Sequence, residues 1–158
     1  MAEPHPLEAW FRRVARLPGG KRAFSRAVCL RAPYFASISP VIQTVEPGHV
    51  VVFLRKRRAV QNHIGTVHAI AMCNACELAG GLATEVGIPS GLRWIPKGMT
   101  VEYLAKATTD LTATACIDSA AIPDRGGELA VPVVVTDTDG QIVMQADITM
   151  WLSEKRPK

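Results

Sequence analysis

The chain has 158 residues, of which 48% are hydrophobic and 20% charged, which is typical of one folded domain and excludes a disordered segment. No apolar run reaches the ~18–20 residues of a membrane-spanning helix, and residues 1–6 lack the features of a secretion signal, so we expect a cytoplasmic protein without a membrane partner. The net charge of +4 favours an anionic ligand, but without zinc-finger, RNA-binding or basic-zipper patterns we expect no nucleic-acid partner.

Two short helices are expected at the N-terminus. Residues 7–17 carry apolar side chains at helical spacing, with arginines on the opposite side: Leu7, Trp10, Phe11, Val14 and Leu17. Pro18-Gly19-Gly20 ends this helix, and a second helix over residues 21–30 ends before Pro33. Residues 1–33 are therefore interpreted as a helical extension.

From residue 35 the pattern changes to that of strands. Residues 37–45 and 50–54 are rich in β-branched side chains and are joined by the turn Glu46-Pro47-Gly48, which predicts a hairpin. Residues 67–86 are instead rich in Ala, Gly and Cys, too small and apolar for an exposed helix, and predict a buried one. Gly80-Gly81 within this helix indicates a close neighbour, because glycine costs about 1 kcal/mol relative to alanine there.

Four more strands follow the buried helix. They are expected over residues 99–104, 111–117, 130–136 and 141–152, with Asp137-Thr138-Asp139-Gly140 as a hairpin turn between the last two. Two strands, one long helix and four strands predict an α+β fold in which one antiparallel sheet wraps a helix. We expect a single domain over residues 1–158, with its core at residues 35–152.

The polar residues next to the buried helix favour catalysis. Asn62 and His68 lie just before it and Glu77 lies within it, where an unpaired buried polar group costs ~1–3 kcal/mol. A carboxylate on such a helix is typical of a general base or nucleophile. Backbone N–H groups at the helix start, around His68 and Ala69, can stabilise a developing negative charge on oxygen. Together these features predict an acyl-transfer site.

The spacing of His68 and Glu77 predicts that two chains share this site. Nine residues place the two side chains on opposite sides of one helix, about 13 Å apart along its axis. One chain therefore cannot bring them together. If both act in one site, Glu77 of one chain meets Asn62 and His68 of another across a two-fold interface.

The pattern Asn62-x-x-Gly65-Thr66-x-His68, followed nine residues later by the acid Glu77, resembles the hotdog-fold acyl-CoA thioesterases of the phenylacetate-pathway type. The resemblance covers about residues 35–152. It implies a hotdog fold, an acyl-CoA substrate, a homodimer or a homotetramer built as a dimer of dimers, and no cofactor or metal. Ala69 and Glu77 replace the more usual Gly and Asp, which indicates a separate subgroup.

The same resemblance implies roles for individual residues. Glu77 is expected to act as base or nucleophile, Asn62 and His68 to position water or the thioester, and the backbone N–H of Ala69 to polarise the carbonyl. Gly65 belongs to the same catalytic loop. Expected substrate contacts are Thr66, Asn74 and Thr100, together with the basic run Arg55, Lys56, Arg57 and Arg58, which is placed to receive the phosphates of coenzyme A.

Several alternatives stay open at this point. A hydratase or dehydratase also uses a histidine and a carboxylate beside an acyl thioester, and a non-catalytic acyl-CoA-binding protein can share the fold. Cys73-x-x-Cys76, with His63 and His68 nearby, fits either a zinc or redox site or two small core residues. The basic run also fits a solvated face. The N-terminal helices either cover an acyl pocket or pad a dimer.

Overall fold

The computed structural model describes residues 4–155. Its helices are α1 (Pro6–Val14), α2 (Gly20–Arg31) and α3 (Ala69–Gly87), with short 3-10 helices at Pro33–Ile38, Arg58–Val60 and Ser119–Ala121. Its strands are β1 (Val41–Glu46), β2 (His49–Leu54), β3 (Leu92–Tyr103), β4 (Leu111–Cys116), β5 (Gly126–Thr136) and β6 (Ile142–Glu154).

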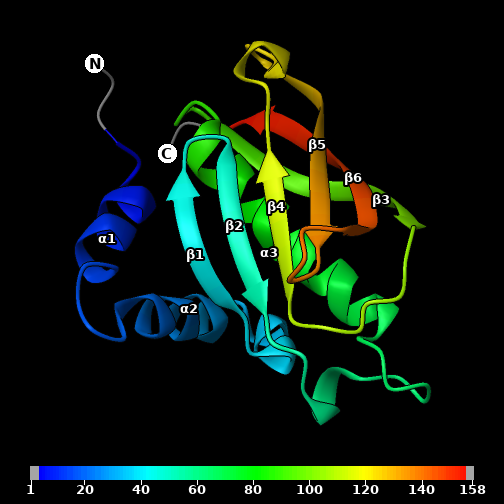
Figure 1. Cartoon of the computed structure of the whole chain (residues 1–158). Helices are drawn as coiled ribbons and strands as arrows, with labels where there is room; N and C mark the ends of the chain where they lie inside the picture. The colour runs from blue at the N-terminus through cyan, green and yellow to red at the C-terminus, as the bar shows by residue number, and fades with distance from the viewer. Residues whose placement is uncertain (1–3, 156–158) are drawn as a thin grey trace.

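The strands form one antiparallel sheet in the order β1-β2-β4-β5-β6-β3, which curves around α3 (Figure 1). Alternate side chains of β4, β5 and β6 point inward and are buried against α3, as expected for a sheet with one covered face. The α+β hotdog fold expected from the sequence is therefore confirmed.

Small side chains allow the sheet to close tightly on α3. A Cβ atom added at Gly80 would lie 2.8 Å from Ile148 Cδ1, and one added at Gly81 would lie 3.0 Å from the ring of Trp94. The close neighbour expected at this glycine pair is thus a set of side chains from the surrounding strands. Because α3 is buried along most of its length, few of its side chains remain free for chemistry.

The N-terminal helices pack on each other and cover the β1 edge of the sheet. Phe24 is fully buried, with its ring centroid 4.6 Å from that of Trp10 and 5.0 Å from that of Phe11. The backbone N–H of Ile42 in β1 donates to Ser25 Oγ of α2 at 2.8 Å. The extension therefore provides a hydrogen-bond acceptor for a backbone N–H of the β1 edge, which would otherwise be unpaired.

Several element boundaries differ from the sequence-based expectations; β5, for example, begins at Gly126 and not at residue 130. Residues 37 and 38 end a 3-10 helix that starts at Pro33, instead of opening the first strand. Helix α1 ends at Val14, which leaves Leu17 62% exposed. Strand β3 begins at Leu92 and runs through Pro96, because β3 pairs only with β6 and an edge strand tolerates a proline.

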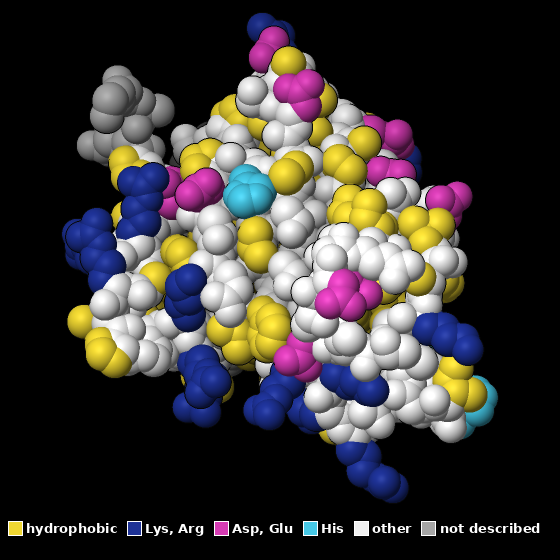
Figure 2. Space-filling view, viewed as in Figure 1, with side chains coloured by type: hydrophobic (Ala, Val, Ile, Leu, Met, Phe, Trp, Pro, Cys, Tyr) yellow, Lys and Arg dark blue, Asp and Glu magenta, His cyan; other side chains and the backbone are white. Residues whose placement is uncertain are grey.

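Charged side chains are distributed unevenly over the surface. In Figure 2, Lys and Arg gather over the left and lower parts of the molecule, whereas most Asp and Glu lie towards the top and right. Most of the exposed arginines come from the N-terminal region and from the segment after β2, and they include Arg12, Arg13, Arg22, Arg26, Arg31, Arg55 and Arg58. Within residues 4–155 no helix is long and apolar enough to cross a membrane.

Candidate active site

The loop before α3 is shaped by Asn62. Its Oδ1 accepts hydrogen bonds from the N–H groups of Ile64 and Thr66, both at 3.1 Å, and its Nδ2 donates to Thr66 Oγ1 at 2.8 Å. Gly65 has φ +78°, a left-handed conformation that favours glycine. Asn62, Gly65 and Thr66 therefore act together to hold the loop in one conformation.

His68 is the N-cap of α3. Its Nδ1 accepts a hydrogen bond from the Ile70 N–H at 3.1 Å, and its own backbone N–H donates to the Val60 carbonyl at 2.8 Å. A neutral imidazole that accepts at Nδ1 carries its proton on Nε2. His68 thus presents a hydrogen-bond donor beyond the helix start, which suits it to polarise an oxygen atom more than to remove a proton.

The backbone N–H of Ala69 is the free donor at this helix start. None of the hydrogen bonds found among the described residues uses it, whereas the N–H groups of His68 and Ile70 are both occupied. The first N–H groups of a helix carry a partial positive charge and bind anionic oxygen. The structure therefore leaves one backbone donor available, at the position expected from the sequence.

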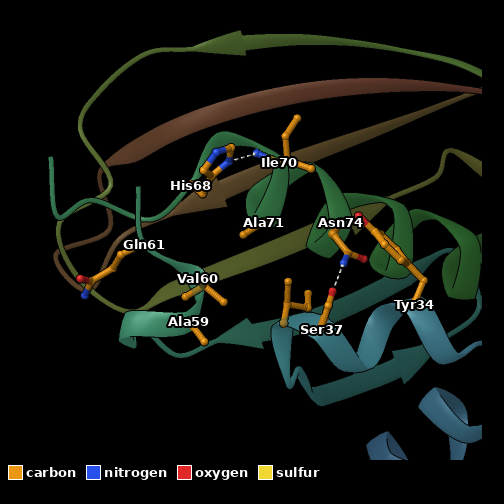
Figure 3. A pocket seen from close by; sticks show the side chains of 10 residues that line it. Tyr34, Ser37, Ala59, Val60, Gln61, His68, Ile70, Ala71 and Asn74 are labelled. Atoms are coloured by element: carbon orange, nitrogen blue, oxygen red, sulfur yellow. Dashed lines mark hydrogen bonds between the residues drawn. The ribbon is translucent and has the colours of Figure 1, made fainter. Parts of the chain in front are cut away.

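A cavity of about 190 Å³ lies beside this helix start (Figure 3). His68 and Ile70 line it on one side and Asn74 lies deeper along α3. Asn74 is only 6% exposed; its Nδ2 donates to Ser37 Oγ at 3.0 Å, and its Oδ1 is buried without a hydrogen-bond partner in the described part of the chain. A buried acceptor without a partner is costly, so this cavity suits a ligand that brings an N–H or O–H donor.

Glu77 is exposed, in contrast to the buried position expected from the sequence, and it lines a different cavity. This second cavity has a volume of about 530 Å³ and is bounded by α1 and α2 on one side and by α3 and Trp94 on the other. Its lining shares no residue with that of the first cavity. Within one chain, Glu77 and His68 therefore line separate cavities, as the helical geometry predicted.

In the basic run of residues 55–58, the Arg57 side chain makes hydrogen bonds within the chain, whereas the Arg55 and Arg58 side chains make none among residues 4–155. Arg57 Nη2 donates to the Ser37 carbonyl at 3.0 Å and to Ser39 Oγ at 3.1 Å, and the Lys56 backbone N–H donates to Asp110 Oδ1 at 2.7 Å. Arg55 and Arg58 are exposed. Two guanidinium groups of the run are therefore free to bind an anion near the first cavity, whose lining includes Ala59 and Val60.

Thr100 and the cysteine pair lie apart from both cavities. Thr100 is exposed on β3, opposite Asp147 of β6, and lines neither cavity. Cys73 Sγ lies 3.6 Å from Tyr103 Oη, and burial raises the pKa of Cys76 to about 12, with a further rise from Cys73. Across residues 4–155, no three His, Cys, Asp or Glu side chains are grouped to hold a metal ion.

Sequence patterns missed several residues that line the two cavities. The sequence pattern places Ser37 in a strand, whereas in the structure it borders the first cavity. Phe35, Glu85 and Trp94 have no role in the sequence-based prediction, and they border the second cavity. Phe35 and Trp94, two aromatic residues outside the expected strands, were the sequence signal that could have indicated the second cavity. An aromatic side chain outside a predicted element often packs over a binding cavity or the core.

Comparisons with known proteins agree with this architecture. Residues 20–152 match the family model described as "Domain of unknown function (DUF4442)". The structural-genomics protein APC5556 has a crystal structure that is 47% identical in sequence, with a TM-score of 0.81, over 94% of this chain and 99% of that one. The comparison with curated proteins finds no match.

Two more distant crystal structures have names that mention a function. PA5026 from Pseudomonas aeruginosa, a protein of unknown function described as a probable thioesterase, is 22% identical, with a TM-score of 0.75, over 88% of this chain and 97% of that one. A thioesterase family protein from Silicibacter pomeroyi is 19% identical, with a TM-score of 0.70, over 83% and 96%. At these identities the likeness establishes the shared fold.

Proposed function

The chain belongs to the DUF4442 family, and we propose that it is a hydrolase that cleaves the thioester bond of an acyl-CoA. The observation that carries this proposal is that one helix carries both a free N-terminal donor and an exposed carboxylate that borders a mainly apolar cavity. The donor is the backbone N–H of Ala69, and the carboxylate belongs to Glu77. Thioester hydrolysis needs both parts, one to stabilise the oxyanion and one to activate water or to attack.

In the proposed reaction a new C–O bond forms at the thioester carbonyl as the C–S bond breaks. With Glu77 as base, its carboxylate takes a proton from the attacking water, and the departing thiolate of coenzyme A recovers a proton. The Ala69 N–H and the Nε2–H of His68 donate to the carbonyl oxygen as negative charge develops on it. Asn62 and Gly65 act indirectly, because they fix the loop that positions His68.

We further propose that the active form is a homodimer in which Glu77 of one protomer faces His68 of its partner. The separation of the two residues into different cavities supports this arrangement. Strand β3 supplies a free edge, and it carries Ile95 at 62% exposure and Tyr103 at 50%. A long edge strand with one unpaired side exposes backbone N–H and C=O groups on which a second copy can dock.

The coenzyme A portion is proposed to lie over the partner's helix-start cavity. Arg55 and Arg58 are free to bind its phosphates, and the buried Oδ1 of Asn74 can accept from an amide N–H in its pantetheine arm. The four free cysteines are consistent with the reducing cytoplasm in which acyl-CoA is made and used. Arg57 is proposed to position the neighbouring segment through Ser37 and Ser39.

The test is hydrolysis of a panel of short, long and aryl acyl-CoAs, followed by release of free thiol. Glu77→Gln keeps the size of the side chain and removes its charge, so we expect turnover to fall by at least about 100-fold. Glu46→Gln, a matched change at an exposed residue of β1 that lines neither cavity, is expected to leave turnover unaltered. Binding of acyl-CoA without turnover by the wild type would instead identify a non-catalytic binding protein, and the proposal would fail.

A further inference from the structure

The cavity beside Glu77 is built jointly by the N-terminal helices and α3. Trp10 of α1 and Val28 of α2 form one wall, and Leu78 and Leu82 of α3 form the facing one. At about 530 Å³ the cavity falls in the size range of small-molecule sites, which are lined mainly by apolar and aromatic side chains. The extension therefore adds a potential binding space to the hotdog core.

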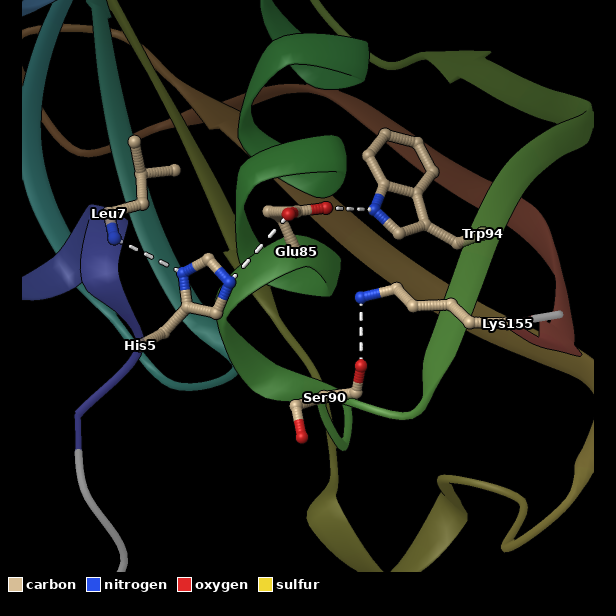
Figure 4. A network of polar contacts seen from close by, with 6 residues as sticks. All are labelled: His5, Leu7, Glu85, Ser90, Trp94 and Lys155. Carbon is tan, nitrogen blue, oxygen red and sulfur yellow. Dashed lines mark hydrogen bonds and ion pairs between the residues drawn. The ribbon is translucent and has the colours of Figure 1, made fainter. Parts of the chain in front are cut away.

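Polar contacts hold one end of this cavity in place (Figure 4). The indole N–H of Trp94 donates to Glu85 Oε2 at 2.7 Å, and His5 Nε2 lies 3.7 Å from Glu85 Oε1. His5 in turn accepts from the Leu7 N–H through Nδ1 at 3.2 Å, which caps α1. Glu85 thus links the first turn of α1 to the Trp94 wall, so the cavity has fixed sides.

Glycine at position 81 lets the Trp94 wall of this cavity pack against α3. A Cβ atom there would lie 3.0 Å from the far edge of the Trp94 ring, so a larger residue would displace the indole. Gly81 is one helical turn after Glu77, and both residues line the cavity. The cavity therefore extends along α3 from the proposed catalytic carboxylate of Glu77 to Gly81.

Three charged residues line the cavity, and they are not equivalent. Both carboxylate oxygens of Glu85 have partners, in Trp94 and His5. The side chains of Glu77 and Arg31 make no hydrogen bond or ion pair among residues 4–155. A ligand that fits this space therefore has an apolar body and places its reactive group at Glu77.

We propose that this cavity binds the acyl chain of the substrate, and that the preferred substrate carries an unsubstituted medium-chain acyl group; this inference rests on the proposed thioesterase function. An apolar chain buries its methylenes between Trp10, Val28 and Trp94, with its carbonyl end at Glu77. A hydroxyl group on a methylene held between these apolar side chains would lose its hydrogen bonds to water and is disfavoured. The extension is therefore a specificity element.

Chain-length dependence of hydrolysis tests the proposal. Each added methylene that enters the cavity should raise kcat/KM about three- to fourfold, from acetyl-CoA through hexanoyl-CoA to decanoyl-CoA. Ala27→Trp fills the cavity from α2, whereas Ala23→Trp makes the same change one turn earlier at an exposed position outside the lining. We expect Ala27→Trp to lower kcat/KM for decanoyl-CoA more than about tenfold and to change acetyl-CoA hydrolysis less than about twofold. Ala23→Trp should change neither.

A second readout separates this inference from the proposed function. Decan-1-ol, a neutral probe whose hydroxyl can donate to Glu77, should bind the wild type and Ala23→Trp by isothermal titration calorimetry, and Ala27→Trp should not bind it. Decan-1-ol binding without any acyl-CoA hydrolysis would overturn the thioesterase proposal and leave the apolar site standing. Hydrolysis that is insensitive to chain length, or lowered equally for both substrates by Ala27→Trp, would overturn the acyl-chain site alone. A structure of the dimer in which the partner's polypeptide fills this cavity would also overturn the acyl-chain site.

Discussion

His68 caps α3 and Glu77 lies within it, but the two exposed side chains line two cavities that share no residue. His68 caps the helix and presents Nε2–H beside the smaller cavity, whereas Glu77 borders the larger, apolar one. Neither cavity contains both a donor at a helix start and a free carboxylate. If the chain is a thioesterase, each active site must therefore combine the first cavity of one protomer with the second cavity of its partner.

This arrangement predicts complementation between two inactive variants. Glu77→Ala and His68→Ala should each have almost no activity alone. After subunit exchange in an equal mixture, half of the dimers are mixed and each has one intact site, so about a quarter of wild-type activity should return. Differently tagged copies allow mixed dimers to be captured and counted. Mixed dimers without recovered activity would show that the two residues do not share a site.

The free arginines after β2 predict a charge effect on substrate affinity. Arg58→Glu should raise KM for acyl-CoA roughly 3–10-fold at low ionic strength and leave kcat nearly constant, because phosphate binding contributes equally to ground and transition states. The effect should shrink at higher salt, since exposed charges are screened. Arg13→Glu on α1 makes the same charge change at another exposed position. Equal increases in KM for both variants would indicate a general field effect instead of a phosphate site.

Local sequence signals were sufficient for most of the fold. The small residues of α3 predicted a buried helix, because no exposed helix is so poor in polar side chains. The turn at Asp137–Gly140 was equally readable: Asp137 Oδ1 accepts from the N–H groups of Asp139 and Gln141, and Gly140 has φ +82°. Each of these features depends on residues close together in the chain.

The cavities could not be predicted in the same way, because distant segments build them. In the first cavity, Asn74 donates a hydrogen bond to Ser37, which lies 37 positions earlier in the sequence. In the second cavity, Phe35 precedes α3 in the sequence and Trp94 follows it. Strand β3 was predicted too short because Pro96 is a breaker in a central strand and is tolerated only at an edge. Which strand is at the edge is a property of the assembled sheet.

Glu85 is predicted to stabilise the N-terminal extension. Glu85→Ala removes the acceptor of the half-buried Trp94 indole N–H and the contact with His5, and should lower the free energy of unfolding by about 1–2 kcal/mol. Glu85→Gln retains a side-chain oxygen for Trp94 and should cost less than half as much. Urea unfolding followed by tryptophan fluorescence measures both. Equal losses for the two variants would mean that the charge matters and that the hydrogen bond does not.

Cys76 of the Cys73-x-x-Cys76 pair is predicted to react more slowly than an exposed thiol. Because burial raises the pKa of Cys76 to about 12, its nucleophilic thiolate is scarce at neutral pH, and its side chain is also inaccessible. Cys116 is exposed. Iodoacetamide should therefore modify Cys116 in the native protein within minutes and leave Cys76 intact until urea unfolds the chain, as followed by mass spectrometry of peptides.

The same shift fixes the sign of a pH effect on stability. The folded protein retains the Cys76 proton up to a pKa of about 12, whereas the unfolded chain releases it near its ordinary value of 9.0. Unfolding is thus coupled to proton release in this window, and the contribution of Cys76 to stability is complete below pH 9.0 and lost as pH rises towards 12. Cys76→Ala should flatten the fall of the unfolding free energy with pH, although it lowers stability at neutral pH by leaving a small cavity. Parallel pH profiles for the variant and the wild type would show that the Cys76 thiol titrates alike in the folded and unfolded states.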